Sequence, residues 1–302
     1  MIADRPSLGI LLMIGFCAIA PLGDAVAKLL GETVPLMQLI AVRFAAQAAL
    51  LYPIIWLSGR TLAMSPRILR IVALRTVLHV AGISMMFTAL RYLPLADAIA
   101  IAFVMPFIML LLGRWVLNEE VGPRRLSACV VGFVGTLLVV QPSFVNVGWP
   151  ALLPLGVAVT FSLYMLVSRH IAKEADPLAL QAVSGLMATP FLVAAIWIWH
   201  DSGIAWLAVK TPDTREILLL ATIGGLGTLA HLLMTWSLRF APSATLAPIQ
   251  YLEIPFATFM GWLIFADLPN GLAALGIAIT MAAGLYIVYR ERMNVEPVPP
   301  ET

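Results

Sequence analysis

Ten apolar stretches divide this chain, and each is close to the roughly 20 residues that a membrane-spanning helix needs. Charged residues and Pro or Gly breaks separate the stretches, and the connections between them are short. Periodicity alone does not distinguish nine spans from ten near 95–141, but nine would break the internal repeat described next. The pattern therefore predicts ten transmembrane helices, at about residues 8–30, 35–57, 68–90, 95–117, 124–141, 149–171, 178–200, 215–239, 243–265 and 271–290.

The two halves of the chain match each other at a constant offset. Leu90–Ala96 reappears as Leu238–Ala244, which is 148 residues later, and the same offset relates Glu119 to Asp267. With five spans in each half, the two copies must lie in opposite orientations in the membrane. This arrangement is typical of secondary transporters, which bind substrate near mid-membrane between the repeats.

The first apolar stretch has some features of a cleaved signal peptide. Arg5 precedes an apolar run that ends in Ala18-Ile19-Ala20. Pro21 directly after this small-residue site argues against cleavage, and the apolar run continues to about Leu30. We therefore interpret the stretch as the first membrane span.

These patterns predict an all-α integral membrane protein with ten transmembrane helices, built as two inverted five-helix repeats. The repeats are expected over residues 8–142 and 149–292. The segment 293–302 contains three prolines and is expected to be a disordered tail.

Composition agrees with a protein that has the bilayer as its solvent. Of its 302 residues, 61% are hydrophobic and only 11% are charged, whereas soluble domains carry about 25% charged residues. The net charge of +2 is small and scattered, so no nucleic-acid partner is expected. Cys17 and Cys129 fall inside apolar stretches and are interpreted as packing residues. No His/Cys cluster has metal-ligand spacing, so no metal or other cofactor is predicted.

The loops differ in their Lys and Arg content, which predicts the orientation. One side holds twelve basic residues and the other four, so both termini are expected to be cytoplasmic. The richer side comprises Arg5, Arg60, Arg67, Arg70, Arg114, Arg124, Arg125, Arg169, Lys173, Arg239, Arg290 and Arg292, and the poorer side Lys28, Arg91, Lys210 and Arg215.

Each half carries motifs at the ends and in the middles of its spans. They are Ala89–Ala98, Pro106, Asn118-Glu119-Glu120 and Gly132-x-x-Gly135, then Leu238-x-x-Ala241-Pro242, Pro248, Glu253-x-Pro255 and Asp267. In this combination the chain resembles the EamA branch of the drug/metabolite transporter superfamily, over about 8–290. The resemblance implies two EamA repeats, movement of small metabolites by alternating access and a place in a bacterial inner (plasma) membrane.

Polar residues recur within single spans at helical spacing, which places them on one helix face. A charge at the bilayer centre costs about 2.5–3.5 kcal/mol on insertion scales, so such groups usually face a cavity or pair with one another. Seven helices are predicted to turn a polar stripe inward around a water-accessible cavity. The stripes are Asp24 and Lys28; Arg43 and Gln47; Arg75 and His79; Thr160, Tyr164 and Ser168; Gln181 and Ser184; Thr228, His231 and Thr235; and Gln250 and Glu253.

The basic members of these stripes are candidates for binding an anionic part of a substrate. Two interpretations of Arg43 stay open, an internal ion pair with Asp24 or direct binding of an anionic group. Arg75 either snorkels to the cytoplasmic surface or faces the cavity. His79 and His231 fall on the same face of related helices, and each is either a substrate- or proton-binding group or a structural histidine.

Glu253 is the acid with the clearest functional signal, because the matching position of the first half is Met105. Scaffold features should recur in both copies, so a charge present in only one of them suggests function. We predict that Glu253 and Asp24 serve ion coupling or ion pairing, and that Gln250, Tyr164 and Tyr251 complete the substrate site. For Glu253 the alternative is a helix-capping or inter-helix anchoring role. The two tyrosines have packing as their alternative role.

The sequence thus predicts a secondary-active transporter of small polar organic metabolites, amino acids or organic acids, with protons as a candidate coupling ion. It is expected to act as a monomer or a homodimer. The alternative is an exporter of cationic drugs or polyamines, which would use Glu253 and Asp24 as binding acids. An enzyme would need a convergent nucleophile and base or a metal cluster, and a channel a repeated pore ring; neither pattern is visible in the sequence.

Overall fold

The computed structural model describes residues 5–118, 121–139, 147–267 and 271–293, and all regular structure within them is helical. The predicted tail beyond Met293, and the acids Glu119 and Glu120, lie outside the described residues. The helices are α1 (Pro6–Gly31), α2 (Leu36–Leu57), α3 (Pro66–Ala89), α4 (Leu95–Ala102), α5 (Met105–Val116), α6 (Pro123–Val139), α8 (Leu153–Ile171), α9 (Pro177–Trp199), α10 (Thr214–Phe240), α11 (Ser243–Leu246), α12 (Glu253–Phe265) and α13 (Gly271–Met293), with the 3-10 helices η2 (Trp149–Leu152) and η3 (Ala247–Leu252).

Local sequence explains where several helices begin. Pro66 and Pro177 stand in the first turns of α3 and α9, where a missing N–H costs nothing. Asp176 caps α9 by accepting a hydrogen bond from the backbone of Ala179. Asp213 and Glu216 form a reciprocal capping box at the start of α10.

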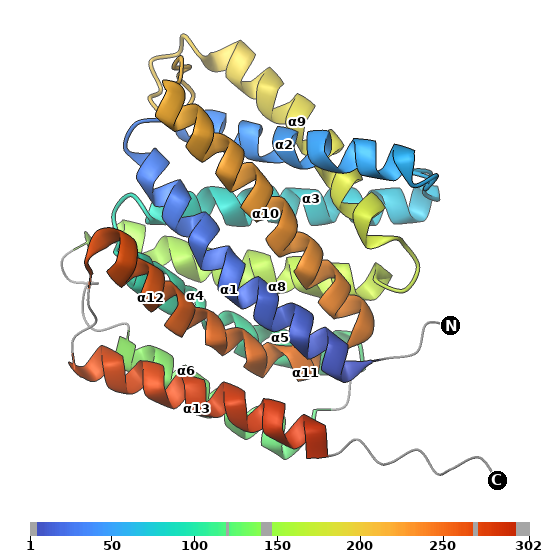
Figure 1. Ribbon diagram of the computed structural model, residues 1–302, viewed down its shortest axis with the longest axis vertical. Coiled ribbons are helices and arrows are strands. Elements are labelled where there is room, and N and C mark those ends of the chain that lie inside the picture. Colours follow the sequence, from blue (N-terminus) through green and yellow to red (C-terminus); the bar gives the residue numbers. More distant parts are fainter. Residues whose placement is uncertain (1–4, 119–120, 140–146, 268–270, 294–302) are drawn as a thin grey trace.

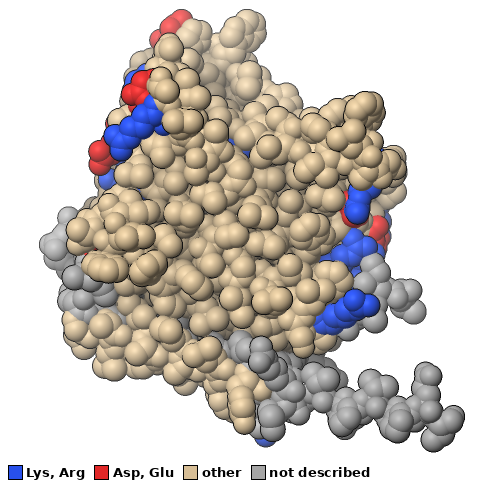
Figure 2. Space-filling view, in the orientation of Figure 1, with Lys and Arg blue, Asp and Glu red and all other residues tan. Residues whose placement is uncertain are grey.

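Seven segments of the described chain are long and apolar enough to cross a membrane. They are Pro6–Gly31, Leu36–Leu57, Pro66–Ala89, Leu95–Val116, Trp149–Ile171, Pro177–Trp199 and Thr214–Phe240. The other three predicted spans correspond to α6, to α11–η3–α12 and to α13; α6 and α13 contain the shorter apolar stretches Leu126–Gly135 and Ala274–Ala283. In Figure 2 the charged side chains gather at two opposite edges, and the face between them is broad and uncharged. The protein is therefore an integral membrane protein.

Two of the predicted spans are interrupted helices. The span over 95–117 turns at Phe103 and Val104 before α5 begins, and Pro106 stands in the first turn of α5. The span over 243–265 contains the 3-10 helix η3, with Pro248 in its first turn. Proline lacks a donor and clashes with the preceding helical turn, which explains both interruptions.

Four helix pairs make the most extensive contacts, and they organise the bundle (Figure 1). These pairs are α1 with α10, α2 with α9, α3 with α8, and α6 with α13. Each pairs an element of the first half of the chain with one of the second half. In Figure 1 the α6–α13 pair lies at one edge of the bundle, and α1 and α10 cross in front of α3 and α8. The main core includes residues from both halves.

The helix boundaries correct the constant offset expected between the halves. Helices α5 and α12 begin at Met105 and Glu253, which are 148 residues apart. Helices α2 and α9 begin at Leu36 and Pro177, which are only 141 residues apart. The offset changes because the connection between α9 and α10 is longer than that between α2 and α3. The matched segments that predicted the offset all lie after this connection, so they show only the offset of 148 residues.

Candidate functional site

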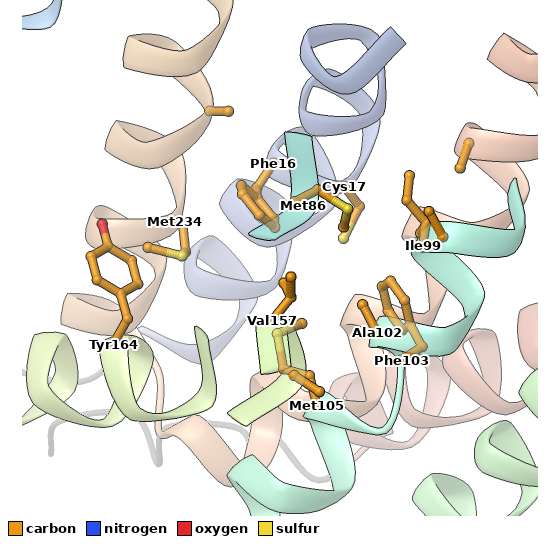
Figure 3. Packing of buried hydrophobic residues seen from close by; sticks show 14 of the residues in the cluster. Phe16, Cys17, Met86, Ile99, Ala102, Phe103, Met105, Val157, Tyr164 and Met234 are labelled. Carbon is orange, nitrogen blue, oxygen red and sulfur yellow. The ribbon is translucent and has the colours of Figure 1, made fainter. Parts of the chain in front are cut away.

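A partly open cavity lies at the centre of the bundle, with about 730 Å³ of empty space including its mouth. Its walls come from α1, α2, α3, α4, α5, α8, α10 and α12, and most of the lining is aliphatic or aromatic. Figure 3 shows part of this wall, where Phe16 of α1, Met86 of α3, Met105 of α5 and Phe103 of the turn between α4 and α5 lie around a common space.

Four charged or titratable side chains line this cavity, and all four were predicted site residues. They are Asp24 of α1, Arg43 of α2, His231 of α10 and Glu253 of α12. Asp24 lies within electrostatic range of both Arg43 and Glu253. Within the described part of the chain, however, no ion pair joins Asp24 to Arg43. The cavity therefore presents one guanidinium and two carboxyl groups in apolar surroundings.

Arg43 is only 3% exposed, and its Nη1 has no hydrogen-bond partner. Its guanidinium lies over the ring of Phe44, 5.3 Å from the ring centroid. Gly227 of α10 makes room for it, because a Cβ there would lie 2.8 Å from Nε of Arg43. A buried donor without an acceptor is costly, particularly on a charged group. An anionic ligand group in the cavity would remove that cost.

Glu253 is the first residue of α12, directly after the 3-10 helix η3, and its side chain is 7% exposed. The corresponding residue of the first half, Met105, also lines the cavity. The acid is thus present on one side of the cavity and a thioether on the other. This is the asymmetry that the sequence indicated.

The two predicted histidines meet at the cavity wall, which His231 lines and His79 does not. Nε2 of His79 lies 3.2 Å from Nε2 of His231, and His79 is completely buried. Nδ1 of His231 lies 3.4 Å from the hydroxyl of Tyr164, and that hydroxyl accepts a hydrogen bond from Arg75. Tyr164 can therefore donate to His231, and His231 can donate to His79. With these donors and acceptors, the proton of His79 lies on Nδ1, which is the ring nitrogen of His79 without a hydrogen-bond partner.

Arg75 is also fully buried, but it does not line the cavity. Its Nε donates to Ser168 over 2.7 Å, its Nη1 to Ser184 over 2.9 Å, and its Nη2 to Tyr164 over 2.6 Å and to Thr235 over 3.3 Å. Every guanidinium nitrogen of Arg75 thus has a protein acceptor. The structure places Arg75 neither at the surface nor in the cavity, which were the two alternatives considered.

Gln250 and Tyr251 belong to η3 and are absent from the cavity lining in the described residues. The hydroxyl of Tyr251 donates to the carbonyl of Cys129, and its ring packs so closely over Gly132 that a Cβ would lie 2.7 Å away. The amide nitrogen of Gln250 contacts the sulfur of Met165 at 3.2 Å. Both side chains therefore hold η3 against its neighbours.

The aromatic part of the cavity wall was missed by reasoning from sequence. Phe16, Phe87, Phe103 and Phe161 all line the cavity, and the rings of Phe16 and Phe161 stack with centroids 6.3 Å apart. Phenylalanines in an apolar helix carry no signal that separates the cavity from lipid or from ordinary packing. Only their convergence from three helices and the turn after α4 identifies them.

A model of the EamA-like transporter family matches the chain twice, over residues 7–141 and 148–290. The chain belongs to the EamA-like transporter family. Membership confirms the resemblance that its motifs suggested and makes the protein a membrane transporter, not an enzyme. The start points of the two matches are 141 residues apart, in agreement with the smaller offset between α2 and α9.

Relatives with assigned functions are transporters of small metabolites. A riboflavin transporter of Rhizobium johnstonii is 31% identical over 228 residues, covering 74% of this chain and 72% of the relative. A riboflavin transporter of Brucella anthropi is 28% identical over 218 residues, covering 72% and 76%. An S-adenosylmethionine uptake transporter of Rickettsia prowazekii is 22% identical over 275 residues, covering 91% and 90%. This EamA member is therefore a small-metabolite transporter.

The fold is also found in an experimental structure. A solved crystal structure superimposes with a TM-score of 0.72, covers 97% of this chain and 100% of that chain, and shares 19% sequence identity. At this level of identity the likeness concerns the fold alone.

Proposed function

We propose that this EamA member carries a small polar organic metabolite, an amino acid or an organic acid, across the membrane by alternating access. The observation that carries the proposal is the unpartnered, buried Nη1 of Arg43 in a cavity that also contains Asp24 and Glu253. A carboxylate beside Arg43 would supply the missing acceptor through a charge-assisted hydrogen bond.

We propose that the transporter is built from ten transmembrane helices in two inverted repeats, over residues 8–142 and 149–292. The contacts support it, because exchanging the halves leaves them unchanged. The pair α1–α10 becomes α8–α3, α1–α12 becomes α8–α5, and α2–α9 and α6–α13 each become themselves. Lys28 and its counterpart Arg169 make similar anchors near the ends of α1 and α8: Lys28 donates to the carbonyl of Leu93, and Arg169 to that of Leu238, three residues before the counterpart of Leu93.

Both termini are proposed to be cytoplasmic, in a bacterial inner membrane. The contacts support the grouping of loops behind that orientation. Arg60 pairs with Asp176 and Arg67 with Glu174 at one end of the bundle. The backbone of Arg5 bonds to Phe240, whose neighbour Arg239 donates to Ala175 at the same end.

Within the two substrate classes, the charges of the cavity favour an amino acid. A simple organic acid would place its negative charge near Asp24 and Glu253, whereas a zwitterion offers a carboxylate to Arg43 and an ammonium group to these acids. The aromatic walls suit a flat ring. S-Adenosylmethionine and riboflavin, the molecules named for the relatives, both contain heteroaromatic rings.

A second candidate function is favoured by the same two acids. Asp24 and Glu253 outnumber Arg43 in the cavity, which is what a transporter of cationic drugs or polyamines would require. The choice between the two functions depends on the charge preference of the ligand.

The first experiment is a thermal-shift screen of the purified protein against amino acids, organic acids, nucleosides and polyamines. A ligand at 100 times its Kd stabilises the protein by about 2.7 kcal/mol, so binding is detected without a transport assay. We expect stabilisation by carboxylate-bearing ligands that is lost in Arg43→Ala and kept in the control Arg60→Ala, which removes an exposed arginine. Stabilisation by polyamines that vanishes in Glu253→Gln and survives Arg43→Ala would instead support the cation exporter.

Proton coupling is proposed to use Glu253, with the His79–His231 pair as the alternative carrier. We expect Glu253→Gln to abolish uptake driven by a pH gradient in proteoliposomes and to spare substrate exchange, because a permanently neutral side chain cannot shuttle a proton. Undiminished pH-driven uptake in Glu253→Gln would remove Glu253 from the coupling step. The same assay on His231→Asn then tests the pair.

A further inference from the structure

Arg75 joins four helices through a single side chain. It belongs to α3, and its guanidinium binds Tyr164 and Ser168 of α8, Ser184 of α9 and Thr235 of α10. These five residues, called the Arg75 cluster below, are all completely buried. None of them lines the cavity.

The repeat gives each member of the cluster a counterpart in the other half of the chain. Residues of α3 and α10 correspond at an offset of 148, and those of α8 and α9 correspond to α1 and α2 at 141. The counterparts of Arg75, Tyr164, Ser168, Ser184 and Thr235 are Ile223, Gly23, Ala27, Arg43 and Phe87. Four of these five counterparts line the cavity, all except Ala27. The cluster therefore occupies the position that the cavity occupies in the other half.

The cluster and the cavity lie toward opposite ends of the bundle. Arg75 lies nine residues after α3 begins at Pro66, near the end that carries the Arg60–Asp176 ion pair. The α3 residues of the cavity, from Gly82 to Phe87, lie in the last two turns of that helix. We call the Arg60–Asp176 end, near which the Arg75 cluster lies, the closed end, and the end toward which the cavity lies the open end.

We propose that the Arg75 cluster is the latch that keeps the closed end shut, and that it opens when the cavity on the other side collapses. The inference rests on the proposed alternating access. In an inverted repeat the second state is obtained by exchanging the conformations of the two halves. The helices α3, α8, α9 and α10 then separate around Arg75, while the counterparts of the cluster pack together.

The partners of Arg75 suit a latch that must release. All four acceptors are neutral hydroxyl groups, and the described residues contain no carboxylate paired with Arg75. Water replaces a hydroxyl acceptor readily when a pathway fills, whereas separating a buried carboxylate from an arginine would leave two unpaired charges. Arg75 can therefore stay charged in both states.

The test measures access to the cavity from each end with a membrane-impermeant maleimide. Ala20 lines the cavity and is partly exposed, so Ala20→Cys is the reporter, in a background where Cys17 and Cys129 are alanine. Without a latch mutation, labelling is expected from the open end only. Arg75→Ala should raise labelling from the closed end by about tenfold or more, because several hydrogen bonds to a charge are lost.

Two further variants keep the test decisive if Arg75→Ala does not fold. Ser184→Ala removes a single acceptor and should raise closed-end labelling to a smaller extent, whereas Thr160→Ala, whose hydroxyl bonds only within α8, should leave it unchanged. Ligands that stabilise the parent protein should still stabilise the latch variants. Unchanged closed-end labelling in both Arg75→Ala and Ser184→Ala, or loss of ligand binding with intact one-sided labelling, would overturn the latch.

The labelling assay needs no substrate, so its outcome is independent of the substrate proposed above. A failed ligand screen with one-sided labelling that depends on Arg75 would contradict the substrate class alone. A cavity that is labelled equally from both ends in the parent protein would show that the closed end is not held shut, and it would contradict the latch alone.

Discussion

The two arginines buried in the bundle differ in how completely the protein satisfies their hydrogen bonds. Arg75 has an acceptor for every guanidinium nitrogen and no contact with the cavity, whereas Arg43 lines the cavity and leaves Nη1 without a partner. Both are nearly inaccessible, at 0% and 3% exposure, so burial does not distinguish them. Hydrogen-bond satisfaction does, because the protein supplies acceptors for the whole guanidinium of Arg75 but none for Nη1 of Arg43, which remains able to donate to a group in the cavity.

The largest expected effect on stability tests the satisfied arginine. Arg75→Ala leaves four buried hydroxyl groups without their shared donor and should lower the unfolding free energy by about 3 kcal/mol. Denaturant unfolding in mixed micelles measures this loss. Arg43→Ala is the matched comparison, and it should cost little because it removes a donor that already lacks an acceptor. Equal losses in the two variants would contradict the distinction between them.

The next effect concerns ligand affinity, and it should appear when Arg43, not Arg75, is replaced. Arg43→Ala should weaken binding of a carboxylate-bearing ligand roughly 10- to 100-fold, as expected for one charge-assisted hydrogen bond. Ligand titrations followed by melting temperature give the ratio. Arg43→Lys should recover part of the affinity, because it restores the charge but not the planar fork. Affinity that is unaltered in Arg43→Ala would exclude this side chain from the site.

The smallest expected effect tests the position of Arg43 through its neighbour. In Gly227→Ala, the new Cβ would lie 2.8 Å from Nε of Arg43, so the guanidinium must shift. We expect about tenfold weaker binding, of the order of one hydrogen bond to a charged group. Gly225 on the same helix is the control, since a Cβ there meets nothing within 4 Å. Gly225→Ala should bind normally, and a similar loss in both variants would point to helix propensity as the cause.

Helical spacing and hydropathy predicted the helices well, because a membrane helix is defined by its own length and polarity. The interruptions at Phe103 and within η3 were less visible, although Pro106 and Pro248 marked their neighbourhood. The repeat was recognised, but its offset was taken as constant because a difference in loop length leaves no trace in the matched segments. Such a change of offset becomes visible only when the first residues of matching helices are compared.

The site was predicted as a set of residues but not as an arrangement. Sequence spacing placed Asp24, Arg43, His231 and Glu253 on inward faces, and the structure brings these four to one cavity. Spacing could not separate them from Tyr251, whose hydroxyl bonds to the backbone of α6. Periodicity states which face of a helix a residue occupies, but not which neighbour that face meets.

The sequence alone thus determined the membrane environment, the family, the approximate spans and the polar stripes, because each depends on composition or on neighbours a few residues apart. The tertiary structure alone decided the partner of each polar group. Arg75 bonds to Ser168, Ser184 and Thr235, which are 93, 109 and 160 residues away, while Arg43 keeps a free donor. Hydrogen bonds act over a few ångströms in space whatever the separation along the chain, so only the packed bundle shows which buried charge is already satisfied.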